Sequence, residues 1–142
     1  MDEIIAYTDG ACSHNPGPGG WGVFILFGTI GKFLKGSHPH TTNNQMEMMA
    51  AIKTLRLLKT PSTITIYTDS QYLQLGASQW IYKWEKSNWK TSNKAIIKNL
   101  DMWKEIYEYI KIHKITWKLV KAHAGNVGNE IADSLATLAK RI

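Results

Sequence analysis

Residues 4–12 read IIAYTDGAC and residues 64–72 read ITIYTDSQY, so Tyr-Thr-Asp follows an apolar run at two distant places in the chain. Each run has the pattern of a buried strand that ends on a carboxylate. If the two strands are parallel neighbours, Asp9 and Asp69 emerge at the same edge of a sheet, where open α/β sheets bind ligands. Taken singly, either aspartate is better explained as a turn or helix-cap residue. The shared Tyr-Thr-Asp context favours one common site.

The first third of the chain predicts an antiparallel meander. A strand over Ile4 to Thr8 is followed by NPGPGG at 15–20, which indicates a turn because Pro and Gly interrupt regular structure. The segments 21–27 and 31–37 are predicted as the second and third strands, separated by the short turn GTIG. The polar stretch HPHTTNNQ at 38–45 ends the meander.

Helices and strands alternate in the rest of the chain. Helical spacing of apolar residues begins at Met46 and continues to Leu58. The later elements are predicted as a strand at 63–67, a helical stretch at 71–84, a helix at 100–112, a strand at 114–123 and a helix at 128–142. One face of the last helix carries the apolar residues Ile131, Leu135, Leu138 and Ile142. Parallel strands need a crossover element, so this order predicts an α/β protein with a mixed sheet and helices packed over it.

The length and composition indicate one globular domain. The 142 residues, of 16.1 kDa, fit a single domain. No apolar run approaches the roughly 18 residues that a membrane helix needs. The opening MDEIIAYTDG lacks the pattern of a secretory signal, so a cytoplasmic location is expected. The one cysteine, Cys12, excludes an internal disulfide and suits a reducing compartment.

The chain is basic, with 17 Lys and Arg against 11 Asp and Glu, a net charge of +6 and a pI of about 9.4. Such a balance attracts nucleic acids or anionic membranes, although solubility alone also explains it. Position favours nucleic acid, because residues 80–98, here the basic segment, combine aromatic with positive side chains and contain one acid, Glu85. Its aromatic and basic residues are Trp80, Lys83, Trp84, Lys86, Trp89, Lys90, Lys94 and Lys98.

Two further acids are candidates for the site of Asp9 and Asp69. Glu47 has Ala50, Ala51 and Thr54 as helical neighbours, a small-residue face that can approach a sheet, but Asn44 and Glu47 also resemble a capping box. For Asp133, a favourable interaction with the dipole of the first helical turns explains the acid slightly better than a role in this site does. Three or four converging carboxylates need neutralisation by hard cations such as Mg²⁺. Two such ions about 3.5–4 Å apart can activate a water and stabilise the charge that develops at phosphorus. Such a cluster therefore predicts phosphodiester hydrolysis.

Four motifs together resemble the type 1 ribonuclease H family, in the bacterial form that has a basic handle. They are YTDGACSHNPGPGGWG at 7–22, TTNNQMEMMAA at 41–51, YTDSQY at 67–72 and HAGNVGNEIAD at 123–133. The resemblance covers residues 1–142 as one catalytic domain, with the handle at about 80–98. It implies a five-stranded mixed sheet, three antiparallel strands then two parallel, with helices on both faces.

The resemblance also implies the activity and its cofactors. The expected reaction is endonucleolytic cutting of the RNA strand of RNA–DNA hybrids, which leaves 3′-hydroxyl and 5′-phosphate ends. Two Mg²⁺ ions per site are expected, for which Mn²⁺ can substitute. The expected partner is the RNA–DNA hybrid substrate, with no membrane binding, and the protein is expected to be a monomer.

Roles follow by position in these motifs. The metal-binding and catalytic carboxylates would be Asp9, Glu47, Asp69 and Asp133. His123 matches a histidine assigned to proton transfer or product release. Residues expected to contact the RNA strand and to probe its 2′-hydroxyls are Cys12, Asn15, Asn43, Asn44 and Gln71. Thr42 and Asn99 would hold a DNA-strand phosphate beside Trp84, and the remaining substrate contacts would be Trp80, Lys86, Trp89 and Lys90.

Less specific explanations stay open for several of these residues. The asparagines suit turns and caps, and at least one of the three tryptophans is expected in the core. Glu85 stands where the handle usually has lysine, and His40 stands where some relatives place an arginine. The alternatives to a ribonuclease H are another nuclease of the same fold, such as a junction resolvase or 3′ exonuclease, and a catalytically silent hybrid-binding module.

Overall fold

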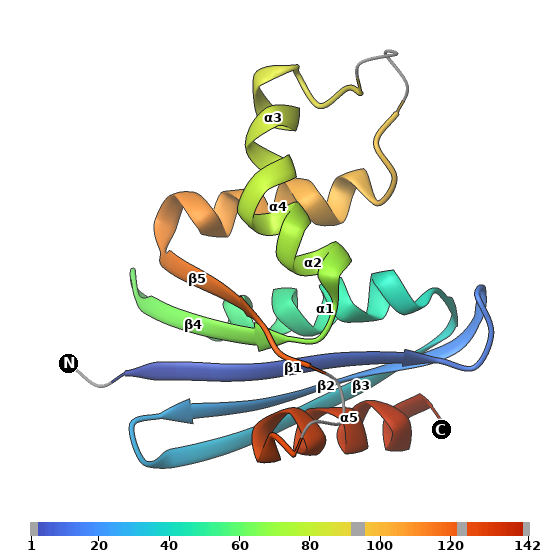
Figure 1. Cartoon of the computed structure of the whole chain (residues 1–142), viewed down its shortest axis with the longest axis vertical. Coiled ribbons are helices and arrows are strands. Elements are labelled where there is room, and N and C mark those ends of the chain that lie inside the picture. Colours follow the sequence, from blue (N-terminus) through green and yellow to red (C-terminus); the bar gives the residue numbers. More distant parts are fainter. Residues whose placement is uncertain (1–2, 92–95, 122–124, 141–142) are drawn as a thin grey trace.

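A computed structural model describes residues 3–91, 96–121 and 125–140 as a mixed five-stranded sheet with helices on both faces (Figure 1). The strand order is β3-β2-β1-β4-β5, with β1 antiparallel to β2 and parallel to β4. The strands are β1 (Ile4–Cys12), β2 (Gly17–Phe27), β3 (Ile30–Thr41), β4 (Thr63–Thr68) and β5 (Lys114–Leu119). The expected fold class is therefore confirmed.

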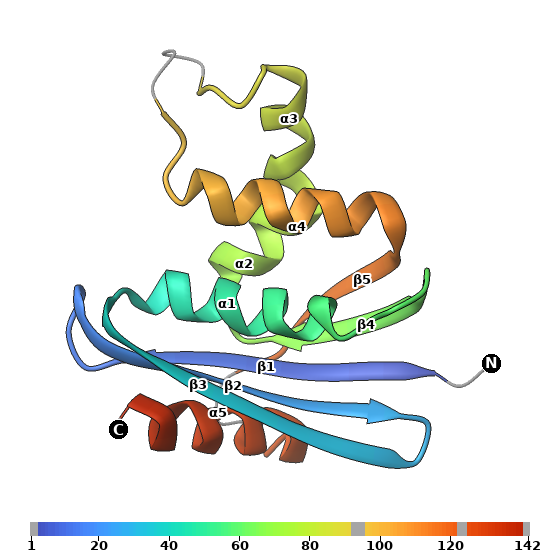
Figure 2. The same cartoon turned by 180° about the vertical axis from the view of Figure 1, so that it is seen from behind.

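The helices divide between the two faces of the sheet (Figure 2). The helical elements are α1 (Asn43–Arg56), α2 (Gln71–Leu75), the π-helical η1 (Gly76–Trp80), α3 (Ile81–Lys86), α4 (Leu100–Ile112) and α5 (Val127–Lys140). α1 packs on β1 with α4 beyond it, whereas α5 covers β1 and β2 from the opposite side. In the described part of the chain, no helix is long and apolar enough to span a membrane.

The predicted turn at 15–20 is largely wrong, because β1 continues to Cys12 and β2 begins at Gly17. Within this extension, Ala11 pairs with Gly20 and Cys12 pairs with Gly19. The glycines serve close packing of helices on the strand. A Cβ at Gly20 would lie 2.5 Å from the carbonyl oxygen of Ala136 in α5.

Two later boundaries also differ from the prediction. The helical stretch from Gln71 to Trp84 is helical throughout, but it is divided into α2, η1 and α3 and extends to Lys86. The last strand ends at Leu119 rather than at residue 123, because the pairing of β4 with β5 ends where Thr68 pairs with Leu119. Residues 122–124 lie outside the described residues.

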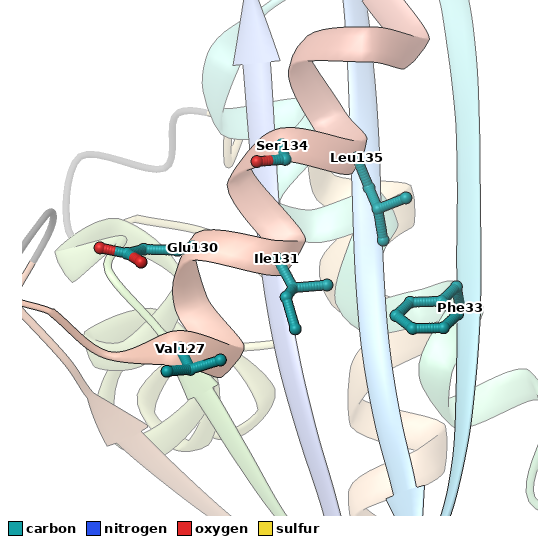
Figure 3. A pocket seen from close by; sticks show the side chains of 6 residues that line it. All are labelled: Phe33, Val127, Glu130, Ile131, Ser134 and Leu135. Atoms are coloured by element: carbon teal, nitrogen blue, oxygen red, sulfur yellow. The ribbon is translucent and has the colours of Figure 1, made fainter.

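The buried face of α5 is not the apolar face predicted from the sequence. The residues that α5 buries are Gly128, Asn129, Ala132, Ala136 and Ala139. By contrast, Leu138 is 51% exposed, and Ile131 and Leu135 are half-buried beside Phe33 of β3 in an open apolar groove (Figure 3). Residue 142 lies outside the described residues. The α5 backbone approaches β2 closely, and this approach requires small side chains at the contact. This requirement outweighs the burial of the larger apolar side chains on the neighbouring face of the helix.

Gly22→Ala is expected to lower the free energy of unfolding by about 1–3 kcal/mol, because it overpacks the contact between β2 and α5. The new Cβ would lie 2.5 Å from the carbonyl oxygen of Ala132 and 2.6 Å from the Cβ of Leu135. Urea unfolding measures the change. Ser134→Ala, at an exposed position of the same helix, should change stability by less than about 0.5 kcal/mol. Equal stabilities of the two variants would contradict this account of the packing.

Candidate active site

The two central parallel strands bring Asp9 and Asp69 together, as the repeated motif predicts. β1 and β4 are parallel neighbours, and their last pair in register is Tyr7 with Tyr67. Each aspartate lies two residues beyond this pair. Asp69 follows the end of β4, but Asp9 does not end its strand, since β1 continues along β2 to Cys12. The site therefore lies where the parallel pairing stops and the antiparallel pairing continues.

Glu47 reaches the same place from α1. The helix is capped by Thr42, whose hydroxyl oxygen accepts a hydrogen bond from the backbone N–H of Gln45 at 3.1 Å. The alternative in which Asn44 caps the helix and Glu47 completes a capping box is therefore wrong. The predicted small-residue face is buried, and a Cβ at Gly10 would lie 2.5 Å from the carbonyl carbon of Met46. The absence of a side chain at Gly10 lets α1 deliver Glu47 directly to β1.

The three carboxylates form one cluster. Potential ligand oxygens of Asp9, Glu47 and Asp69 all lie within 4.8 Å of one another. Asp9 and Glu47 are each only 3% exposed. Asp133, from α5, lines the same cleft but does not belong to this group of three. This surface, which we name the acidic cleft, has a volume of about 440 Å³ and is lined by Asp9, Gly10, Asn43, Asn44, Glu47, Asp69, Ser70, Gln71, Tyr72 and Asp133.

Burial and mutual repulsion favour the protonated form of the clustered carboxylates in the absence of a cation. Burial, followed by the charges of Asp69 and Asp133, raises the pKa of Asp9 to about 8. Burial and the nearby Asp9 and Asp69 hold the pKa of Glu47 well above its usual value. Oε1 of Glu47 is buried without a hydrogen-bond partner in the described part of the chain. An unpartnered buried oxygen among clustered carboxylates fits a hard divalent cation, which prefers oxygen ligands.

The raised pKa of Asp9 predicts that the metal-free protein loses stability as the pH rises. Between its ordinary value of 3.8 and about 8, Asp9 holds more proton in the folded state than in the unfolded state. Its contribution to the unfolding free energy therefore falls by up to about 1.4 kcal/mol per pH unit across this window.

Urea unfolding of the wild type and Asp9→Asn in EDTA, at pH 5, 6.5 and 8, tests this prediction. The difference between the two proteins is the informative quantity, because burial lowers the pKa of His113 and gives the opposite pH dependence in both. Asp9→Asn should gain stability relative to the wild type as the pH rises, and added Mg²⁺ should reduce its advantage. A constant difference would contradict the assigned protonation of Asp9.

A second cleft adjoins the first and shares Asn43 and Asn44 with it. It has a volume of about 450 Å³ and is lined by Asn15, Pro16, Thr42, Asn43, Asn44, Lys98 and Asn99. Oδ1 of Asn15 accepts a hydrogen bond from the backbone N–H of Asn43 at 2.8 Å, which ties the loop after β1 to the start of α1. We name this surface the amide cleft, because four of its residues are asparagines.

Six of the twelve predicted substrate contacts therefore lie in two adjoining clefts. Gln71 is in the first, and Thr42 and Asn99 are in the second. Sequence reasoning did not assign individual contacts to Tyr72 and Lys98, which also line the clefts. Their positions one residue after Gln71 and one before Asn99 are the signals that could have found them.

Several predicted contacts lie outside both clefts. The thiol of Cys12 faces the backbone carbonyl oxygens of His14, at 2.6 Å, and Thr41, at 3.3 Å. Trp84 and Trp89 are half-buried against the hydrophobic core, in agreement with the expectation that at least one tryptophan packs there. Trp80 is half-buried, with its ring centroid 6.0 Å from that of Trp84. Lys86 and Lys90 are exposed, while His123 and Lys94 lie outside the described residues.

Comparison with known proteins identifies the family. A model of the family described as RNase H matches residues 1–141. The ribonuclease H of Orientia tsutsugamushi (strain Boryong) is 54% identical over 137 residues, which are 96% of this chain and 82% of that protein. The ribonuclease H of Cupriavidus pinatubonensis is 52% identical over 136 residues, 96% of this chain and 94% of that protein. The chain belongs to the RNase H family.

Solved structures agree with this assignment. LC9-RNase H1, described as a type 1 RNase H with the type 2 active-site motif, is 30% identical with a TM-score of 0.89, over 99% of this chain and 73% of that chain. LC11-RNase H1, solved in complex with an RNA/DNA hybrid, has the same fold with a TM-score of 0.71 at 20% identity, over 98% of this chain and 97% of that chain. The protein is thus an enzyme of the ribonuclease H class.

Proposed function

We propose that the protein is an endoribonuclease that hydrolyses the RNA strand of RNA–DNA hybrids at the acidic cleft and leaves 3′-hydroxyl and 5′-phosphate ends. The observation that carries this proposal is the meeting of Asp9, Glu47 and Asp69 within 4.8 Å. Such a cluster in a protein of net charge +6 suits an anionic substrate that arrives together with divalent cations. The family membership supports the same reaction.

The carboxylates would hold the cofactor, for which we propose two Mg²⁺ ions. Asp9, Glu47 and Asp69 would supply the oxygen ligands, and Asp133 lines the same cleft from α5. When bound, divalent cations supply activation of water and neutralisation of charge on the phosphate that is attacked. The tight packing of α1 on β1 at Gly10 fixes the acids relative to one another, so the site needs little rearrangement. His123 stays a proposed participant in proton transfer or product release.

Amide side chains would select the RNA strand. Asn43 and Asn44 lie at the boundary between the two clefts, and Gln71 lies beside Asp69 in the acidic cleft. Amides can both donate to and accept from a 2′-hydroxyl, the group that distinguishes RNA from DNA. With all four carboxylates in one chain, a single copy would suffice for activity, which supports a monomer. The single cysteine is compatible with the proposed cytoplasmic location.

A cleavage assay with three labelled substrates tests the proposed function. An RNA–DNA hybrid, duplex RNA and duplex DNA are incubated with the protein and Mg²⁺, with EDTA as the control. Internal cuts confined to the RNA strand of the hybrid, and absent in EDTA, are expected. Binding of the hybrid without cleavage would favour a silent binding module, and cutting of duplex DNA would favour another nuclease of this fold.

A further inference from the structure

Asn99 has an unusual conformation for a residue at the start of a helix. It is the N-cap of α4, yet its φ and ψ angles of 59° and 35° are left-handed and its side chain makes no capping hydrogen bond. An N-cap asparagine normally uses its side-chain oxygen for its own helix. Here Oδ1 of Asn99 instead accepts a hydrogen bond from Nε2 of Gln45, at 3.1 Å.

Gln45 belongs to a longer relay of side-chain hydrogen bonds. The hydroxyl of Thr41 donates to Oε1 of Gln45 at 2.9 Å, which leaves Nε2 to face Asn99. Nδ2 of Asn99 donates to the hydroxyl of Tyr72 at 3.1 Å, and so does Nε1 of Trp103, also at 3.1 Å. The relay thus joins the end of β3, α1, α4 and α2. Because Trp103 is fully buried, the Tyr72 end of the relay is anchored in the core.

The relay determines which way the side-chain amide of Asn99 points. A primary amide offers two N–H donors and one oxygen acceptor. The oxygen of Asn99 is turned toward Gln45, and one of the two hydrogens on Nδ2 is used by Tyr72. The other hydrogen has no partner among the described residues, and Asn99 lines the amide cleft together with Lys98. Among the described residues, no acid lines this cleft, whereas Lys98 brings a positive charge to it.

We propose that Gln45 is a positioning residue that makes the amide cleft specific for a backbone phosphate. Its amide N–H holds the oxygen of Asn99 away from the cleft, so that Asn99 presents a donor rather than an acceptor to the anion. Without Gln45, the amide of Asn99 can rotate and present its oxygen to the phosphate, which is repulsive. This inference rests on the proposed function, because it assigns the side of the amide cleft formed by Thr42, Lys98 and Asn99 to the strand opposite the one that is cut.

The same relay links the two clefts, since Tyr72 lines the acidic cleft and Asn99 lines the amide cleft. A phosphate held at Asn99 is therefore held at a fixed distance from the carboxylates. Gln45 contributes no side chain to the lining of either cleft. Its loss should weaken substrate binding more than the chemical step.

Gln45→Met tests the role of the relay, because it keeps the length of the side chain and removes its donor and acceptor. We expect KM for the hybrid to rise about tenfold, the effect of losing one hydrogen bond to a charged group, with kcat changed less than twofold. Gln45→Glu keeps an acceptor for Thr41 but has no N–H for Asn99, so it should raise KM at least as much. Gln74 is a half-buried glutamine of α2. Gln74→Met is therefore the matched control and should leave KM unchanged.

A substrate with neutral backbone positions separates positioning from general loss of structure. Single methylphosphonates are placed along the DNA strand of the hybrid, and KM is measured for each position. For the wild type, one position should raise KM about tenfold, and for Gln45→Met the same position should raise it less than twofold. Equal sensitivity of the two proteins, or no sensitive position in the wild type, would overturn the inference. Failure of the wild type to cut unmodified hybrid would instead contradict the proposed function.

Discussion

Asp69→Asn is expected to reduce cleavage of the RNA–DNA hybrid by about a thousandfold or more while hybrid binding changes less than about threefold. The amide keeps the shape of the side chain but removes the negative charge that holds a cation. Stabilisation of a phosphoryl transition state by cations is worth several kcal/mol, and each 1.36 kcal/mol is a factor of ten in rate. Asp69 lines the acidic cleft and is only partly buried, so the fold should tolerate the change.

Single-turnover cleavage at saturating hybrid gives the rate of the chemical step, and binding measured in EDTA gives the affinity for the hybrid. Glu108→Gln is the matched control, because it makes the same carboxylate-to-amide change at an exposed position of α4, where Glu108 pairs with Lys111. The control should retain full activity. Turnover by Asp69→Asn within tenfold of the wild type would contradict the role of this carboxylate as a metal ligand.

Neutralising Lys83, Lys86 and Lys90 together is expected to raise KM for the hybrid strongly and to flatten its dependence on salt. The three side chains are exposed and belong to the basic segment, and we propose that they bind the hybrid outside the two clefts. Each lost phosphate contact reduces the salt slope by roughly 0.7–0.9, so three contacts would reduce it by about 2–3. The carboxylates lie on other elements, so kcat at saturating hybrid should change little.

The control for this variant removes the same charge elsewhere. Neutral substitutions of Lys32, Lys35 and Lys114 change three exposed lysines of β3 and β5 and should leave the salt slope closer to that of the wild type. Glu85→Lys, within the basic segment, should lower KM and steepen the slope. If the triple variant of the basic segment keeps the wild-type slope, or loses kcat as heavily as Asp69→Asn, this segment does not act as a substrate clamp.

The convergence of the acids could be predicted because it depends on local patterns. Two identical Tyr-Thr-Asp runs place Asp9 and Asp69 at equal distances beyond a shared strand register, and the structure has Tyr7 paired with Tyr67. The small neighbours of Glu47 likewise indicated a helix face that approaches a sheet. The bounds of α4 were also predicted correctly from residue spacing, at Leu100 and Ile112.

Other features depend on contacts between distant segments and had no local signal. Gly20 was predicted in a turn, but it lies in β2, where the backbone of α5 rests against it. For the same reason, the alanines of α5 are buried while Leu138 is exposed. The hydrogen bond between Gln45 and Asn99 joins residues 54 positions apart. Spacing in the sequence carries no information about such a bond.

The central claim is that Asp9, Glu47 and Asp69 together hold a divalent cation, and anomalous diffraction from crystals soaked in Mn²⁺ tests it most directly. The expected result is a manganese peak at bonding distance from carboxylate oxygens of all three residues, which disappears in Asp69→Asn crystals treated in the same way. A fully soaked wild-type crystal whose only manganese peaks lie away from these three carboxylates would contradict the account.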